Sequence, residues 1–106
     1  MTGHVTWQEN IMKITVVCGN GLGTSLMLEM SIKNILKELG VEARVEHIDL
    51  GSAKGTVSDI FIGTKDIAEQ LIIQNVNGTI IALENILDKS AMKARLYAVL
   101  FEIGKL

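Results

Sequence analysis

Proline is absent from this 106-residue chain, and cysteine occurs only once. A single cysteine cannot form an internal disulfide, so we expect the chain in a reducing cytoplasm. Aromatic residues are only 4% and the formal net charge is -2. Both argue against a nucleic-acid partner, which calls for a cationic surface and stacking platforms. Since no apolar stretch approaches the ~20 residues of a membrane span, no direct membrane insertion is expected.

What remains is typical of one small globular domain, with 48% hydrophobic and 21% charged residues. The first eleven residues, MTGHVTWQENI, are polar and aperiodic. We therefore predict a disordered extension over residues 1–11, and a folded domain over residues 12–106 that begins where the apolar run starts at Met12.

Runs rich in β-branched residues alternate with stretches of helical spacing along the domain. The predicted strands cover residues 13–17, 42–50, 58–63 and 79–83, with helices at 24–39, 64–74 and 88–103. This alternation predicts a small three-layer α/β sandwich with a four-stranded parallel sheet. Ligands of such sheets bind beyond the carboxyl ends of the strands, where residues 18–25 follow the first strand.

Capping and turn residues mark the ends of these elements. Thr24 or Ser25 can cap the first helix and Asp88 the last. Gly40 and Gly104 supply left-handed stops, and Asn77-Gly78 predicts a turn. Two apolar stripes are expected to face the core: Leu28, Ile32, Ile35, Leu36 and Leu39 in the first helix, and Met92, Leu96, Val99, Leu100 and Ile103 in the last.

The lone cysteine stands at the head of a glycine-rich loop, C-G-N-G-L-G-T-S, from Cys18 to Ser25. Alternate glycines allow successive backbone N–H groups to point inward, and the following helix adds its own unpaired N–H groups. Such a loop can bind a tetrahedral dianion without a basic side chain. The same field is expected to lower the pKa of Cys18 and make its thiolate a nucleophile.

Other interpretations of the loop fit its sequence less well. A dinucleotide fingerprint would need a third glycine at Thr24, although Asp49 after the second strand imitates the ribose-binding acid. A Walker A loop would need a lysine, and a disulfide oxidoreductase a second cysteine. A buried structural cysteine beside an ordinary strand-to-helix turn is the remaining alternative.

From Met12 onward, VVCGNGLGTS and the order of strands and helices resemble the enzyme IIB components of the bacterial phosphoenolpyruvate-dependent sugar phosphotransferase system (PTS). The loop looks most like the ascorbate-type branch, with the galactitol and lactose types as near relatives. The resemblance implies a phosphotransferase whose Cys18 accepts a phosphoryl group from the histidine of a IIA partner. It would pass that group to a sugar, expected to be ascorbate, held by the membrane IIC transporter. The implied phosphate-binding residues are Gly19, Asn20, Gly21, Leu22, Gly23, Thr24 and Ser25.

The loop also resembles the C-x5-R loop of low-molecular-weight tyrosine phosphatases, which share the implied fold. Here the arginine position is Thr24, and without proline there is no Pro-backed Asp loop to supply an acid. We hypothesise that these omissions let a phosphocysteine survive in water. A small cysteine phosphatase and a sensory IIB-like module, phosphorylated only to signal, stay open as alternatives.

A second pattern on the first helix predicts a partner-docking face for IIA or IIC, away from the core stripe. Its members are Leu26, Met30, Lys33 and Lys37. His47 could approach the active end of the sheet, but a histidine there is more often a strand-edge residue bonded to backbone or water. No metal site and no cofactor are expected, since the acidic and histidine residues lack ligand spacing.

Overall fold

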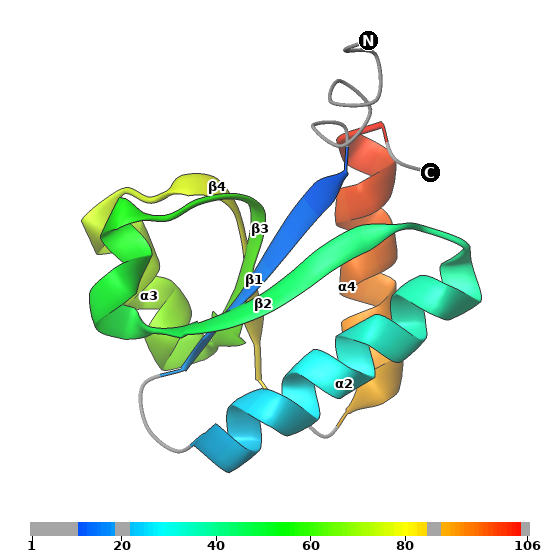
Figure 1. Cartoon of the computed structure of the whole chain (residues 1–106), viewed down its shortest axis with the longest axis horizontal. Helices are drawn as coiled ribbons and strands as arrows, with labels where there is room; N and C mark the ends of the chain where they lie inside the picture. Colours follow the sequence, from blue (N-terminus) through cyan, green and yellow to red (C-terminus); the bar gives the residue numbers. More distant parts are fainter. Residues whose placement is uncertain (1–10, 19–21, 85–87, 105–106) are drawn as a thin grey trace, which may run out of the picture.

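The computed structural model describes residues 11–18, 22–84 and 88–104, with backbone alone for residues 22–25. Strands and helices alternate along this chain (Figure 1). The elements are β1 (Met12–Cys18), α2 (Leu22–Leu39), β2 (Ala43–Asp49), the 3-10 helix η1 (Leu50–Gly55), β3 (Val57–Thr64), α3 (Lys65–Gln74), β4 (Asn77–Leu83) and α4 (Lys89–Glu102).

The four strands form one sheet in the order β2-β1-β3-β4, and every neighbouring pair is parallel. Figure 1 shows α2 and α4 on one face of this sheet and α3 on the other. The connection from β2 to β3 adds η1 to the α3 side, where Ala53 packs with Leu71. The predicted three-layer α/β sandwich with a four-stranded parallel sheet is confirmed.

The central strand β1 is buried on both faces because a layer of helices covers each side. Ile14 and Val16 join the core beneath α2 and α4, whereas Val17 joins the core beneath α3. Burying each such side chain stabilises the fold by about 2 kcal/mol. The predicted stripes of α2 and α4 supply Leu28, Ile32, Ile35, Leu36, Met92, Leu96 and Leu100 to the first of these cores.

The prediction for the start of the first helix was wrong. Helix α2 begins at Leu22, so Thr24 and Ser25 lie inside its first turn rather than at its cap. At the other end Gly40 has φ +72°, as its left-handed stop requires. Asp88 caps α4 as predicted, accepting a hydrogen bond from the N–H of Ala91 at 3.0 Å.

The turn before β4 lies earlier than Asn77-Gly78. Asn75 takes the left-handed conformation that ends α3, with φ 57°, and Asn77 and Gly78 already belong to β4. Gly78 is needed for a different reason: a Cβ there would lie 2.3 Å from the carbonyl oxygen of Ser58. Ile103, predicted to be in the core stripe of α4, follows the helix and is 37% exposed.

Hydrogen bonds join β1 and β3 near their amino ends. The buried hydroxyl of Thr15 donates to that of Ser58 at 2.9 Å, and Ser58 lies within 2.9 Å of the carbonyl oxygen of Lys13. Asp59 accepts from the backbone N–H of Lys13 at 2.8 Å. Asp59 is therefore a strand residue that binds the neighbouring strand.

The predicted boundary between extension and domain falls at the start of β1. Met12 is the first strand residue and is only 2% exposed, whereas Ile11 is 40% exposed. The rest of the predicted extension, residues 1–10, lies outside the described residues. Within the described part of the chain, no helix has the length and apolar character needed to cross a membrane.

Candidate functional site

Cys18 is the last residue of β1. This strand borders the switch point of the sheet, where the strand order changes direction. From β1 the chain passes by way of α2 to β2 on one side, and β3 lies on the other. Such switch points leave a crevice beyond the carboxyl ends of the strands. The cysteine is half-buried, with one side packed against the core beneath α2.

The environment of Cys18 contradicts the expected low pKa. Burial raises the pKa of the Cys18 thiol above its ordinary value, because the apolar core disfavours a charged sulfur. A reaction at this sulfur requires that its proton be removed.

The predicted phosphate-binding loop is only partly described. Gly19, Asn20 and Gly21 lie outside the described residues, and for residues 22–25 the structure gives backbone alone. The backbone from Leu22 onward is helical, so three residues separate Cys18 from α2. Residues 22–25 of the predicted loop therefore form the amino end of this helix. The unpaired N–H groups and partial positive charge of a helix start favour an anion at this place.

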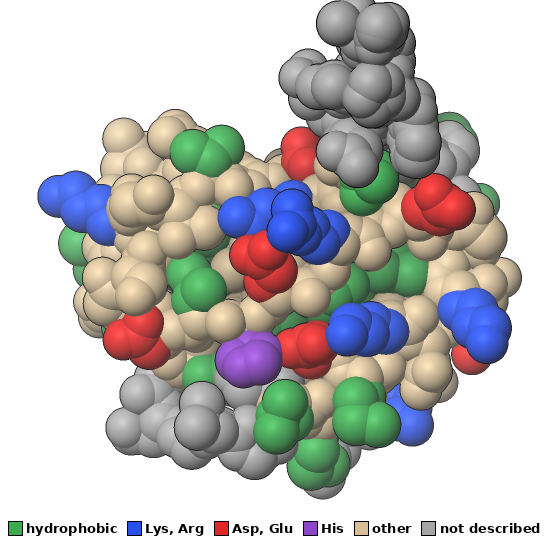
Figure 2. Space-filling model, viewed as in Figure 1, with side chains coloured by type: hydrophobic (Ala, Val, Ile, Leu, Met, Phe, Trp, Pro, Cys, Tyr) green, Lys and Arg blue, Asp and Glu red, His purple; other side chains and the backbone are tan. Residues whose placement is uncertain are grey.

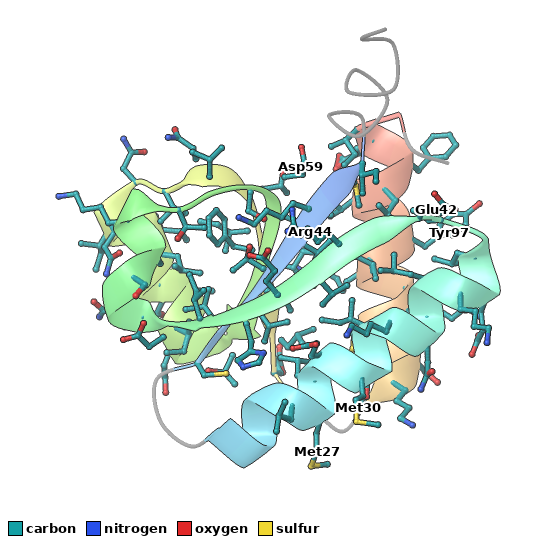
Figure 3. All side chains as sticks on the ribbon, viewed as in Figure 1. Met27, Met30, Glu42, Arg44, Asp59 and Tyr97 are labelled. Atoms are coloured by element: carbon teal, nitrogen blue, oxygen red, sulfur yellow. The ribbon has the colours of Figure 1, made fainter. Side chains whose placement is uncertain are left out.

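The apolar members of the predicted docking face are exposed beside this site. Leu26 is 49% and Met30 64% exposed, and Met27, which the sequence analysis missed, is 55% exposed. Figure 3 shows Met27 and Met30 pointing away from the sheet, and Figure 2 shows apolar side chains gathered on this part of the surface. Met27 lies outside the helical spacing by which the docking face was predicted. The signal that could have revealed it is its place beside Leu26 in an apolar run.

The basic members continue the same face along α2. Lys33 and Lys37 are both exposed, and Lys33 binds the carboxylate of Glu29 at 2.8 Å. Both lysines line a hollow of about 1000 Å³ between α2 and β2, whose floor includes Leu36 and Val41. We name Leu26, Met27, Met30, Lys33 and Lys37 the α2 face.

His47 makes a contact that the sequence did not indicate. Its Nδ1 lies 2.5 Å from Oε1 of Glu29, so that β2 is joined to α2. The side chain of Glu29 is only 14% exposed, and that of His47 is 37% exposed. The hydrogen bond from Lys33, followed by the one with His47, lowers the pKa of Glu29. Histidine and glutamate lie eighteen residues apart on different elements, so no spacing rule connects them.

These features define a doubly wound α/β domain with its single cysteine at the switch point of the sheet. The family described as "PTS system, Lactose/Cellobiose specific IIB subunit" matches residues 13–97. The chain belongs to this IIB family of the phosphotransferase system, and it is a phosphotransferase component.

Individual relatives agree with the family. The chain is 33% identical over 91 residues to the "Ascorbate-specific PTS system EIIB component" of Mycoplasma pneumoniae, which covers 84% of this chain and 95% of the relative. The protein of the same name from Escherichia coli O157:H7 is 27% identical over 93 residues, with 86% and 91% covered.

A solved structure shows the same fold. The lactose-specific IIB domain from Streptococcus pneumoniae superposes with a TM-score of 0.54 at 15% identity, covering 90% of this chain and 97% of that domain. At such low identity the likeness concerns the fold alone.

Proposed function

We propose that this chain is a phosphocarrier. Cys18 accepts a phosphoryl group from the phosphohistidine of a IIA protein and passes it to a sugar held by a IIC transporter, on the cytoplasmic side of the membrane. The observation that carries the proposal is the place of Cys18, at the carboxyl end of the central strand and immediately before the loop that leads into α2.

The chemistry suited to this place is an in-line displacement at phosphorus. The sulfur–phosphorus bond forms as the nitrogen–phosphorus bond of the donor breaks, with catalysis chiefly by positioning and electrostatic stabilisation. Gly19, Asn20, Gly21, Leu22, Gly23, Thr24 and Ser25 would surround the phosphoryl oxygens with backbone N–H groups and hydroxyls, as their sequence favours. The start of α2 adds a partial positive charge on the same side.

Both partners must reach the same sulfur, so both are expected to contact the α2 face in turn. Its three exposed apolar residues lie on the first turns of the helix that follows Cys18. An apolar cluster of this kind, continued by exposed lysines, is typical of protein interaction surfaces.

Ascorbate is the sugar that we propose. The names of the relatives from Mycoplasma pneumoniae and Escherichia coli support it. The sequence VVCGNGLGTS, with its similarity to the ascorbate-type branch, supports it as well.

The test is the intact mass of the protein after incubation with phosphoenolpyruvate, the general phosphotransferase proteins and a cognate IIA. We expect one added phosphoryl group in the wild type and none in Cys18→Ser. Membrane vesicles that carry the cognate IIC should then remove the group when ascorbate is present, but not when lactose is.

Each other outcome favours a different function. A group that enters but is not removed by any sugar favours a sensory module. An unchanged mass with phosphate released from an aryl phosphate favours a cysteine phosphatase. If neither reaction occurs, Cys18 is structural and the proposal is wrong.

The docking part of the proposal has a matched pair of variants. Met30→Asp places a charge on the α2 face, whereas Ile73→Asp alters a 74% exposed apolar residue of α3, on the other side of the sheet. We expect about a tenfold slower transfer from IIA for Met30→Asp and an unchanged rate for Ile73→Asp. Charge reversal at Lys33 and Lys37 should slow transfer too. Equal rates for all variants would remove the α2 face from the docking surface.

A further inference from the structure

The contact between Glu29 and His47 fixes which ring nitrogen of the histidine is available. A carboxylate can only accept a hydrogen bond, so a neutral imidazole presents its Nδ1–H to Oε1 of Glu29. The lone pair of Nε2 is then left free to accept a proton. Lys33 holds the other carboxylate oxygen of Glu29 at 2.8 Å, so this carboxylate is anchored from two sides.

Strand register places His47 diagonally opposite Cys18. His47 pairs with Val16 and Asp49 pairs with Cys18 in the parallel β1–β2 ladder. From a strand spacing of ~4.8 Å and a rise of ~3.3 Å per residue, the Cα atoms of Cys18 and His47 are about 8 Å apart.

Both side chains also project from the same face of the sheet. Cys18 packs against the core beneath α2, and His47 contacts Glu29 of α2 itself. An aromatic ring such as that of His47 is long enough to reach across such a diagonal.

A reaction at this cysteine calls for a proton acceptor. Burial raises the pKa of the Cys18 thiol, whereas the thiolate is the nucleophile. Imidazole is suited to removing such a proton, because it titrates near neutral pH.

We propose that His47 accepts the proton of the Cys18 thiol during phosphoryl transfer, and that Glu29 is the positioning residue that orients its ring. This inference rests on the proposed function. As the sulfur–phosphorus bond forms, the thiol proton moves to Nε2 of His47. The donor histidine, protonated on its other ring nitrogen, leaves as neutral imidazole. The imidazolium of His47 is then stabilised by the carboxylate of Glu29.

Other charged groups face the same place. Asp49 on β2 is in register with Cys18 and exposed, and Lys33 on α2 shares Glu29 with His47. A carboxylate is a weaker base than an imidazole and is poorly matched to a thiol proton, so Asp49 is the weaker acceptor. Asp49→Asn is therefore the variant with which His47→Gln is compared.

The first experiment uses the protein alone and does not depend on any partner. Alkylation of Cys18 by iodoacetamide is followed by intact mass from pH 5.5 to 9.5. We expect His47→Gln to react several-fold more slowly than wild type between about pH 6 and 8, with the two rates converging at higher pH, where the thiol ionises unaided. Glu46→Gln, which alters a half-buried carboxylate one residue away on β2 that pairs with Lys13 and Arg44, should leave the profile unchanged.

The second experiment measures single-turnover transfer from phosphorylated IIA across the same range. We expect about a 10²-fold lower rate constant for His47→Gln, the lower end for general base catalysis. Its profile should lose the decline toward acid pH that wild type shows. Glu29→Gln should retain that decline but move it to lower pH, because the imidazolium loses its carboxylate.

The two experiments separate this inference from the proposed function. If wild-type Cys18 never takes up a phosphoryl group, the proposed function fails, while the alkylation profile still decides the role of His47. Matching alkylation profiles for wild type and His47→Gln would overturn the inference. So would transfer by His47→Gln within twofold of wild type, or a loss of rate in Asp49→Asn equal to that in His47→Gln.

Discussion

The end of the sheet at which its strands begin, here called the amino edge, is built differently from the end at which they finish, the carboxyl edge. The same four strands form both. At the amino edge, polar groups are matched: Thr15 is fully buried and bonds Ser58, and Lys13 bonds Asp59. At the carboxyl edge, Cys18 is half-buried, and His47 and Asp49 are exposed. Side-chain hydrogen bonds join β1 to β3 at one edge, while partly exposed side chains that no such bonds join across the strands, among the described residues, lie at the other.

The largest effect on stability is expected from Gly78→Ala, at the amino edge. Its new Cβ would lie 2.3 Å from the carbonyl oxygen of Ser58 and 2.9 Å from the ring of Phe61, at a φ of +155°. We expect a loss of about 3 kcal/mol or more in the free energy of unfolding, measured in urea.

The matched control is Gly55→Ala, where an added Cβ meets nothing within 4 Å. It should change stability by no more than about 0.5 kcal/mol. Equal stabilities for the two variants would mean that the amino edge is not closely packed.

Ser58→Ala tests the hydrogen bonds of the same edge. It leaves the buried hydroxyl of Thr15 without its partner, which should lower the free energy of unfolding by about 1–3 kcal/mol. Transfer to Cys18 should stay unchanged once the protein is folded, since Ser58 lies at the other edge.

A double-mutant cycle with Thr15→Val sharpens this result. The double variant should lose less than the sum of the two single losses, because no unpaired hydroxyl remains. Strict additivity would contradict the pairing of these hydroxyls.

Thr24→Arg tests whether a phosphocysteine would survive because residues 18–25 carry no cationic side chain. A guanidinium at this position would clamp the phosphoryl oxygens and stabilise the transition state for attack by water. We expect about tenfold faster hydrolysis of the phosphorylated protein, followed by its intact mass. Thr24→Gln provides a control of similar reach without charge, and hydrolysis no faster in Thr24→Arg than in this control would count against the idea.

The smallest expected effect is the contribution of Glu29 to stability at acid pH. Because Lys33 and His47 lower the pKa of Glu29, its contribution is complete above the ordinary glutamate pKa and is lost as pH falls through the lower folded value. We expect Glu29→Gln to be less stable than wild type by under about 1 kcal/mol at pH 6, since both partners are substantially exposed.

That difference should shrink below about pH 4.5. Glu38→Gln removes the carboxylate of an ion pair that is exposed on both sides, and serves as control. A gap that stays constant down to pH 3 would show that the ion pairs of Glu29 do not stabilise the fold.

Much of the fold could be predicted because local patterns carry it. The β-branched run at residues 13–17 and the apolar stripe of α2 lie in the core, as expected. The errors fell on residues whose conformation depends on distant contacts. Gly78 lies in β4 rather than in a turn, and Ser58 and Phe61 approach it so closely that a Cβ would clash.

At the candidate site, sequence alone placed Cys18 at the carboxyl end of the first strand, as the structure has it. It could not give the pKa of Cys18, because the burial that raises it comes from side chains of other elements. The same limit hid the contact between His47 and Glu29, whose residues meet only after β2 has paired beside β1 and α2 has packed across it.

The sequence by itself determined the order of the elements, the parallel sheet and the place of the thiol at a carboxyl strand end. These follow from periodicity and handedness, which act within a few residues or one crossover. Only the tertiary structure decided the direction in which the pKa of that thiol is shifted and the partner of His47. Both depend on packing between segments that are far apart in the chain, where burial and geometry set the chemistry.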